Sequence, residues 1–107
     1  MENPIVLYCD LAVDSAREQE MLQNYHQRFK PAAEAFDGFI DLKMLKLNKV
    51  LQGPAPPNTI NYRFQLTYQS EAKRQAWIAS DIHQEVWPLI EDTVTDKNYQ
   101  VLLTDSV

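Results

Sequence analysis

His83 has the most versatile side-chain chemistry in this sequence, because an imidazole titrates near neutral pH. Such a group can act as a general base toward a bound hydroxyl group, or it can orient the hydroxyl oxygen. His83 also follows the apolar phase of a predicted helix, which directs it toward the protein interior. The competing interpretation is a structural residue at the core boundary, since no carboxylate stands at a fixed spacing from it. His26, beside Tyr25 on another predicted helix, is a weaker candidate.

Three tyrosines and one arginine are candidates for binding a substrate oxygen. Tyr25, Tyr62 and Tyr68 carry hydroxyls that can donate hydrogen bonds to an oxygen of a bound molecule. Arg63, on the polar side of a predicted strand, could neutralise an anion. Other interpretations remain open. The tyrosines could be amphipathic packing residues, and Arg63 could form a cross-strand ion pair with Asp41 or another carboxylate of the sheet.

The sequence offers few groups for a metal or a nucleotide. Cys9 is the single cysteine, so it can form neither an internal disulfide nor a multi-cysteine zinc site, and we expect it in the core. His26 and His83 fall on different predicted helices without metal-ligand spacing, so no metal site is predicted. Gly38 and Gly53 are too few to build a glycine-rich phosphate loop. We therefore expect no cofactor.

Length and charge restrict the class of protein. The chain has 107 residues, a mass of 12.4 kDa and a formal net charge of −5, which suits a single domain over residues 1–107. The acidic balance argues against nucleic-acid binding. No apolar run is long enough for a membrane span, and no secretory signal is visible. With a single cysteine, these features predict a cytoplasmic protein without membrane contact.

Hydrophobic patterns predict strands and helices in the order βαββαβ. We expect strands at residues 5–13, 39–49, 60–68 and 99–104, and helices at residues 15–36 and 70–87. Residues 50–58 contain one glycine and three prolines, which predicts a loop extended as a flap between two strands.

Helix boundaries are predicted from caps and prolines. Ser15, three residues before a glutamate, indicates a capping box, and Asp81 is expected to start a second helical segment after a break. Pro31 should kink or restart the first helix, because it lacks an N–H and clashes with the preceding turn. Pro88 should end or redirect the second helix after Trp87.

Two helices on a four-stranded antiparallel sheet make a ferredoxin-like α+β fold. Helices cover only one face of such a sheet, yet several predicted strands are apolar on both sides. An uncovered apolar face is typical of a partner site. The sequence therefore predicts a homodimer that forms through the sheet face.

Three segments resemble the antibiotic biosynthesis monooxygenase family. Residues 36–41, Phe-Asp-Gly-Phe-Ile-Asp, resemble its helix-to-strand turn. Residues 68–70, Tyr-Gln-Ser, resemble its strand-to-helix passage, and residues 77–83 resemble its W-x-x-S-x-x-H segment. The resemblance implies a small dimeric α+β barrel. It also implies a range of activities, because some members oxidise phenols, anthrones or quinols with O₂ and no metal or flavin, some degrade haem, and many have no known activity.

The resemblance also implies site residues. Trp77 would wall an aromatic pocket between helix and sheet; alternatively, Trp77 is a core residue. Beyond what the resemblance implies, we expect Phe29 and Trp87 to bind the rings of a substrate. Some quinone-forming members have an asparagine at the position of Lys73, and the haem-degrading branch has its axial histidine at the position of Trp87. Because of Lys73, the sequence does not show which residue would contact the substrate oxygen. Because of Trp87, the sequence argues against haem binding.

The first hypothesis is a cofactor-independent monooxygenase that oxidises an electron-rich aromatic, with His83 and Trp77 as the catalytic pair. The alternative is a module that binds or tailors a small hydrophobic or aromatic metabolite without oxygenation, or a structural dimer without catalysis.

Overall fold

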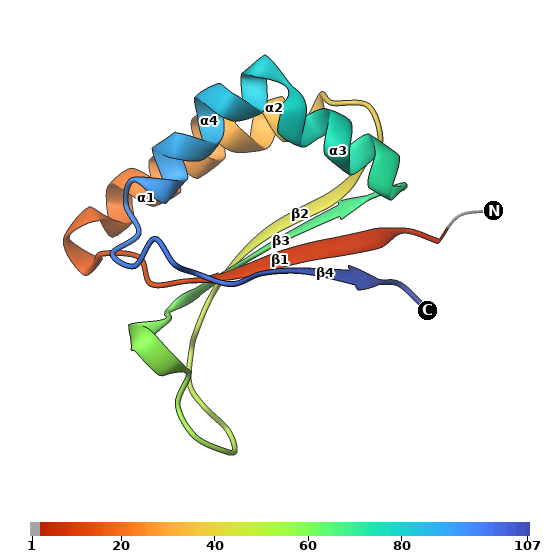
Figure 1. Cartoon of the computed structure of the whole chain (residues 1–107). Coiled ribbons are helices and arrows are strands. Elements are labelled where there is room, and N and C mark those ends of the chain that lie inside the picture. Colours follow the sequence, from red (N-terminus) through yellow and green to blue (C-terminus); the bar gives the residue numbers. More distant parts are fainter. Residues whose placement is uncertain (1–2) are drawn as a thin grey trace.

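Four antiparallel strands and one layer of helices make up the computed structural model, which describes residues 3–107 (Figure 1). The strands are β1 (Ile5–Leu11), β2 (Phe39–Lys46), β3 (Tyr62–Tyr68) and β4 (Val101–Asp105). Their order across the sheet is β2-β3-β1-β4, and every neighbouring pair is antiparallel. The predicted ferredoxin-like α+β fold with the order βαββαβ is therefore confirmed.

Two helical passages follow β1 and β3 and lie on the same side of the sheet (Figure 1). The first contains η1 (Ser15–Arg17), α1 (Glu18–Asn24), the π-helical turn η2 (Tyr25–Phe29) and α2 (Lys30–Glu34), and the second contains α3 (Glu71–Ala79) and α4 (Asp81–Glu91). Within residues 3–107, no helix has the length and apolar character needed to cross a membrane.

The core lies between the helices and the inner sides of β1 and β3. Leu7 stands opposite Leu66 and Cys9 stands opposite Phe64 in the ladder, and all four side chains are buried. Their alternation with more exposed neighbours is the period-two pattern that gave the strands in the sequence. Burying each large apolar side chain contributes roughly 1.5–3 kcal/mol, so this inner face supplies much of the folding free energy.

The helix caps differ from the sequence predictions by one residue. Asp14, not Ser15, begins the first passage, because its carboxylate accepts a hydrogen bond from the N–H of Ala16 at 2.9 Å. Ser80, not Asp81, begins α4, because its Oγ accepts from the N–H of His83 at 3.2 Å. In both places two adjacent residues are of types that cap helices well. The earlier residue is the cap because its backbone dihedrals are not helical, as an N-cap requires.

The two helix prolines behave differently. Pro31 follows the π-helical turn η2, in which the N–H of Lys30 bonds to the carbonyl of Tyr25, so the predicted change of helix at Pro31 is confirmed. Of the two effects predicted for Pro88, an end to the second helix is wrong, because α4 continues to Glu91. Pro88 and Gln84 are both exposed, so water can hydrate the Gln84 carbonyl that loses its N–H partner.

The loop between β2 and β3 is a long flap, as predicted, and we use "flap" for residues 47–61. It is longer at both ends than the predicted loop of residues 50–58, because β2 ends at Lys46 and β3 starts at Tyr62. The N–H of Leu47 bonds to the carbonyl of Asn61 at 2.8 Å and closes the flap at its base. From that base the flap extends away from the helix layer, on the side of the sheet that the helices leave open (Figure 1).

Gly38 forms the turn from the first helical passage into β2. Its φ is +94°, a value that L side chains rarely adopt, and a Cβ at this position would lie 2.6 Å from the Cβ of Lys73. The Lys73 Nζ also forms an ion pair with the Asp37 carboxylate of the same turn. Gly38 therefore allows α3 to pack directly against the turn.

This geometry predicts that Gly38→Ala destabilises the protein more than Gly53→Ala. Both glycines have positive φ, so each alanine adds about 1–2 kcal/mol of backbone strain, but the space around Gly53 is open. Gly38→Ala adds a steric clash with Lys73. Urea unfolding of the two variants measures the difference, and equal losses in the free energy of unfolding would contradict this account.

Candidate functional site

A cavity of about 140 Å³ lies between the helices and the inner face of the sheet. Its lining comes from η2, α3, α4, three strands and the segment before β4: Leu7, Cys9, Phe29, Phe64, Leu66, Arg74, Trp77, Ile78, His83, Trp87, Tyr99 and Val101. Ile78 and Val101 are 37% and 55% exposed, so the open side of the cavity lies between α3 and the edge strand β4. Most of the lining is apolar or aromatic, as in sites for small organic ligands.

Aromatic rings form the walls of the cavity. The ring of Phe29 meets the rings of Phe64, Trp77 and Trp87 edge-on, with centroids 5.3, 5.8 and 5.8 Å apart. The imidazole of His83 lies nearly parallel to Trp87 at 6.5 Å and edge-on to Trp77 at 5.2 Å. Rings at these distances pack directly against one another, so they form one continuous aromatic wall. The predicted residues His83, Trp77, Trp87 and Phe29 are thus brought together.

Two buried polar atoms in this lining have no hydrogen-bond partner among the described residues. They are the indole Nε1 of Trp77, whose side chain is fully buried, and the Nδ1 of His83. A buried donor or acceptor without a partner costs roughly 1–3 kcal/mol, so native proteins rarely keep one without a reason. A hydroxyl oxygen can accept from the Trp77 N–H and donate to an unprotonated His83 Nδ1. The pair therefore suits the –OH of a phenol or alcohol.

Burial lowers the pKa of His83 below its ordinary value of 6.5. The imidazole is therefore neutral at pH 7 and can accept a proton. The other titratable groups around the cavity are Arg74 on α3, Cys9 on β1 and Tyr99 before β4. Burial and the neighbouring Asp10 raise the pKa of the Cys9 thiol to about 12, and burial raises that of Tyr99, so both stay protonated.

Trp87 is held in place by a relay that the sequence did not reveal. Its indole N–H donates to the Tyr99 hydroxyl at 3.1 Å, and this hydroxyl donates to the carboxylate of Glu91. Glu91 lies one helical turn after Trp87, so the sequence spacing alone could have indicated that these two residues are neighbours. The position of Tyr99 could not be predicted in the same way, because β4 starts at Val101, two residues later than predicted, and Tyr99 lies in the segment before it. The relay fixes the indole that faces His83.

Arg74 is the second lining residue that sequence reasoning missed. It lies one helical turn before Trp77 on α3, and its guanidinium makes two hydrogen bonds to Glu71, at 2.9 and 2.5 Å. These bonds raise the pKa of Arg74 and lower that of Glu71. Lys73, at the position where some family members carry asparagine, instead pairs with Asp37. Arg74, not Lys73, is therefore the cation beside the cavity.

The structure does not bring Tyr25, Tyr62 or Arg63 to this cavity. Tyr25 is a buried core residue that packs on Phe29 with ring centroids 6.4 Å apart. Arg63 lies on the opposite face of the sheet and pairs with Asp10, its cross-strand neighbour, at 2.7 Å. This is the ion pair with a sheet carboxylate that the sequence left open, although Asp41 is not the partner. Arg63 therefore cannot steady an oxygen anion beside His83.

Tyr62 and Arg63 instead line a second, larger concavity of about 440 Å³ at the base of the flap. Tyr62 itself is buried, and burial beside Glu18 raises its pKa to about 12. His26 is exposed and lies outside both hollows. Across residues 3–107, no three His, Cys, Asp or Glu side chains gather in a way that could hold a metal ion.

Comparisons with known proteins support the fold. No family model and no curated protein matches the sequence. A solved protein from Bordetella bronchiseptica, named "Putative antibiotic biosynthesis monooxygenase", is 14% identical with a TM-score of 0.76, covering 99% of each chain. A "dimeric ferredoxin-like protein of unknown function" from Jannaschia sp. CCS1 is 11% identical with a TM-score of 0.78, covering 96% of this chain and 99% of that chain.

A third solved protein shows that different chemistry is named for the same fold. It is a hydroxynitrile lyase from Passiflora edulis, 11% identical with a TM-score of 0.75, covering 100% of this chain and 96% of that chain. Likeness at these identities establishes the fold: a ferredoxin-like α+β domain, shared with proteins named for antibiotic biosynthesis monooxygenase. The ferredoxin-like α+β fold implied by the sequence resemblance is therefore confirmed for the single chain. The dimer stays a prediction, and the reaction has to be argued from the site.

The cavity predicts slow reaction of Cys9 with thiol reagents in the native protein. The thiol is 2% exposed and its pKa of about 12 leaves almost no thiolate at pH 8. Disulfide-exchange labelling at pH 8 should release one equivalent rapidly in guanidinium chloride and slowly in buffer. Because Cys9 is the single cysteine, the denatured chain is its own control. Equal labelling rates in the two conditions would show that Cys9 is accessible in the native protein and would contradict this prediction.

Proposed function

We propose that this protein is a cofactor-independent monooxygenase, and that its helix–sheet cavity binds an electron-rich aromatic such as a phenol, quinol or anthrone. The observation that carries the proposal is the pair of partnerless buried atoms, Trp77 Nε1 and His83 Nδ1, among the aromatic rings of the cavity. The fold shared with proteins named as antibiotic biosynthesis monooxygenases supports it. Family membership is part of this proposal.

The first step is proton transfer. A neutral His83 accepts the proton of the substrate hydroxyl through Nδ1, and the resulting phenolate oxygen accepts a hydrogen bond from the indole N–H of Trp77. Both donors then face the developing negative charge, and few polar groups compete with them in this apolar cavity. Arg74 adds positive charge beside the cavity, partly balanced by Glu71.

The substrate then supplies the electrons. A phenolate is electron-rich enough to transfer one electron to O₂, and the resulting phenoxyl radical, whose unpaired electron is shared with the ring, combines with superoxide into a peroxide at a ring carbon that carries hydrogen. Loss of water from this peroxide leaves a carbonyl. The net reaction converts an aromatic C–H and O₂ into C=O and H₂O, with the phenol becoming a quinone, so O₂ takes up all four electrons. The protein contributes orientation and exclusion of bulk water.

The size of the cavity limits how the substrate sits. A volume of about 140 Å³ lies below the range of sites that enclose whole drug-sized ligands, roughly 300–1,000 Å³. We infer that the reacting ring enters and that the remainder of a polycyclic substrate extends past Ile78 and Val101, which line the open side. These exposed apolar residues would contact the outer rings.

The second candidate is a module that binds a small hydrophobic metabolite without oxygenation. It is favoured by one observation: no carboxylate hydrogen-bonds to the His83 ring within the described residues, so nothing on the protein orients the imidazole as a strong base. The fold also accommodates a protein named as a lyase. Ligand binding without oxygen consumption would select this candidate, and absence of both would leave a structural dimer.

The proposed partner is a second copy of this chain, seated on the uncovered sheet face. This face is more polar than the sequence suggested. Its side chains come from alternate strand positions: Val6, Tyr8, Asp10, Asp41, Lys43, Leu45, Arg63, Gln65, Thr67, Leu102 and Thr104. Asp10 pairs with Arg63, and Asp41 pairs with Lys43, so the two cations and two anions give the face no net charge. Two copies of an otherwise acidic protein can therefore meet here without repulsion. Like the dimer, a cytoplasmic location remains a prediction.

Oxygen uptake with naphthalenetriol-type and anthrone substrates tests the oxygenase. Without added metal or flavin, the wild type should consume O₂, and His83→Gln should lower kcat/KM roughly a hundredfold or more. Trp77→Phe keeps the ring and loses the N–H, for an expected loss of roughly tenfold. His26→Gln changes an exposed histidine outside the cavity and should match the wild type. Uptake that is equal in wild type and His83→Gln across the panel would remove the proposed mechanism.

The pH dependence of kcat/KM tests the role of His83 separately. Because burial lowers the pKa of His83, the neutral base persists below the ordinary histidine value of 6.5, and activity should be lost only as pH falls through the lower folded-state pKa. The acid limb should therefore lie below pH 6.5 and disappear in His83→Gln. An acid limb that is identical in the two proteins would assign the base elsewhere.

A further inference from the structure

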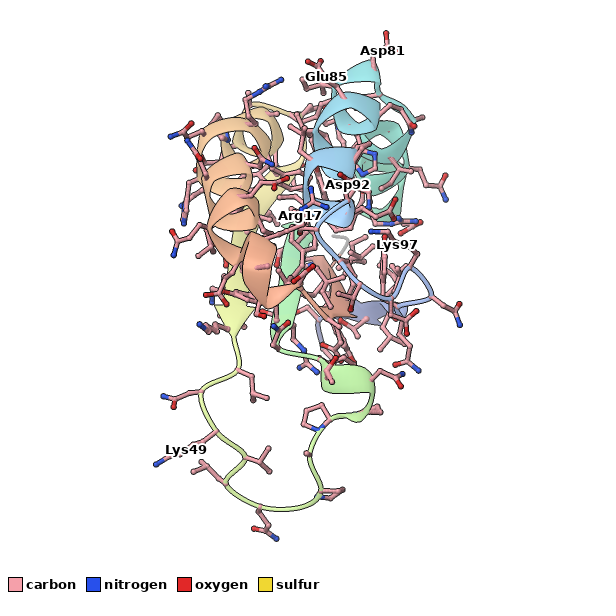
Figure 2. The ribbon with its side chains drawn as sticks, turned by 90° about the vertical axis from the view of Figure 1, so that its left-hand side faces the viewer. Arg17, Lys49, Asp81, Glu85, Asp92 and Lys97 are labelled. Carbon is pink, nitrogen blue, oxygen red and sulfur yellow. The ribbon has the colours of Figure 1, made fainter. Side chains whose placement is uncertain are left out.

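The flap exposes apolar side chains that nothing in its own chain covers. Leu47 and Val50 are 43% and 42% exposed, and Leu51 is 85% exposed near the tip. Surface leucines scattered singly need no explanation, but here three apolar residues gather on one projecting segment. In both views the flap stands clear of the helix layer (Figure 1, Figure 2). It projects on the side where the proposed second copy would sit.

The flap is held at a fixed angle to the sheet. Asn61 at its base donates its N–H to the carbonyl of Leu11 at 3.0 Å, and its side-chain amide both accepts from and donates to the backbone of Val13, at 2.8 and 3.0 Å. The prolines at positions 54, 56 and 57 restrict the returning arm. Asn58 and Thr59 both have positive φ, at 58° and 57°, and set a sharp bend before β3. A stiff segment loses little conformational entropy when a partner binds it.

The angle between flap and sheet forms a concave surface. The 440 Å³ concavity takes its lining from both sides: Asp10, Leu45, Tyr62 and Arg63 from the sheet, and Lys46, Leu47, Asn48, Pro56 and Ile60 from the end of β2 and the flap. Three of these residues, Asp10, Leu45 and Arg63, belong to the uncovered face. The concavity is therefore continuous with the face on which the second copy is proposed to sit.

Charge points to the same occupant. Lys49 is the single charged residue of the flap, and it projects from the flap away from the body of the protein (Figure 2). The chain as a whole carries a net charge of −5, and the uncovered face carries none. The excess of acidic residues therefore lies outside this neutral face, and a flap whose one charged residue is a lysine is complementary in charge to that remaining surface.

We propose that the flap is a clasp, which reaches beyond the paired sheets and packs Leu47, Val50 and Leu51 against a second copy of this chain. The clasp rests on the proposed sheet-to-sheet homodimer and goes beyond it. Under two-fold symmetry each copy clasps the other, so every flap contact occurs twice per dimer. The clasp explains why the longest loop of the chain is apolar and rigid at its base, since solvated loops of this length are usually polar and mobile.

Sedimentation equilibrium of Leu51→Ser and of Val50→Ser tests the clasp. Because a lost apolar contact is counted twice, Leu51→Ser should raise the dimer dissociation constant roughly tenfold or more. Gln52→Ser changes the neighbouring exposed polar residue and should leave the constant unchanged. Leu51 is so exposed that its replacement cannot disturb the fold of one chain, which thermal unfolding of the variant confirms.

The outcomes separate the clasp from the dimer. A wild type that sediments as a single 12.4 kDa chain at micromolar concentration would overturn both. A wild-type dimer whose dissociation constant is the same in Leu51→Ser, Val50→Ser and Gln52→Ser would keep the sheet interface and overturn the clasp. Hydrogen exchange gives an independent measurement, because flap amides should lose protection on dilution below the dissociation constant. Protection that does not change with dilution would also count against the clasp.

Discussion

Phe29 is the residue on which the arrangement of the other cavity elements depends. Its ring meets Phe64 from β3, Trp77 from α3 and Trp87 from α4, so one side chain of η2 fixes the distance between the sheet and both later helices. Phe29 closes the π-helical turn that precedes Pro31, a residue that cannot donate the hydrogen bond of a regular helix. The π-helical turn before Pro31 thus sets the position of Phe29, the residue at the centre of the aromatic cluster.

The aromatic cluster gives the cavity its chemical character. Large rings leave gaps that smaller side chains would fill, and the lining of this gap includes Trp77 and His83, each with a buried nitrogen atom that no protein group satisfies. A neutral imidazole and an indole N–H form a complementary pair for one hydroxyl oxygen. Because the described residues offer little other reactive chemistry at this site, the proposed reaction draws its electrons from the substrate. The protein positions the oxygen and the ring.

The sequence predicted the order of the elements, because strand alternation and helical periodicity depend on neighbouring residues. Helical periodicity also predicted that His83 faces the interior, and the family resemblance placed Trp77 at a pocket between helix and sheet. The sequence could not decide between a substrate-binding and a structural role for Arg63, because the polar side of a strand suits an anionic ligand and a cross-strand carboxylate equally well. The relay from Trp87 through Tyr99 joins residues that only the path before β4 brings together. Pro88 was misassigned because helix tolerance depends on exposure, which a sequence pattern does not contain.

The central claim is that Trp77 and His83 bind the hydroxyl of an aromatic ligand. The indole ¹H–¹⁵N resonances test it directly, since the chain has two tryptophans and the Trp87 N–H already donates to Tyr99. With the resonances assigned by Trp87→Phe, addition of a naphthol under argon should shift the Trp77 indole proton downfield as its N–H gains an acceptor. The methyl ether of the same naphthol, which cannot donate to His83, should bind more weakly. A Trp77 resonance that stays in place at saturating naphthol would contradict the account.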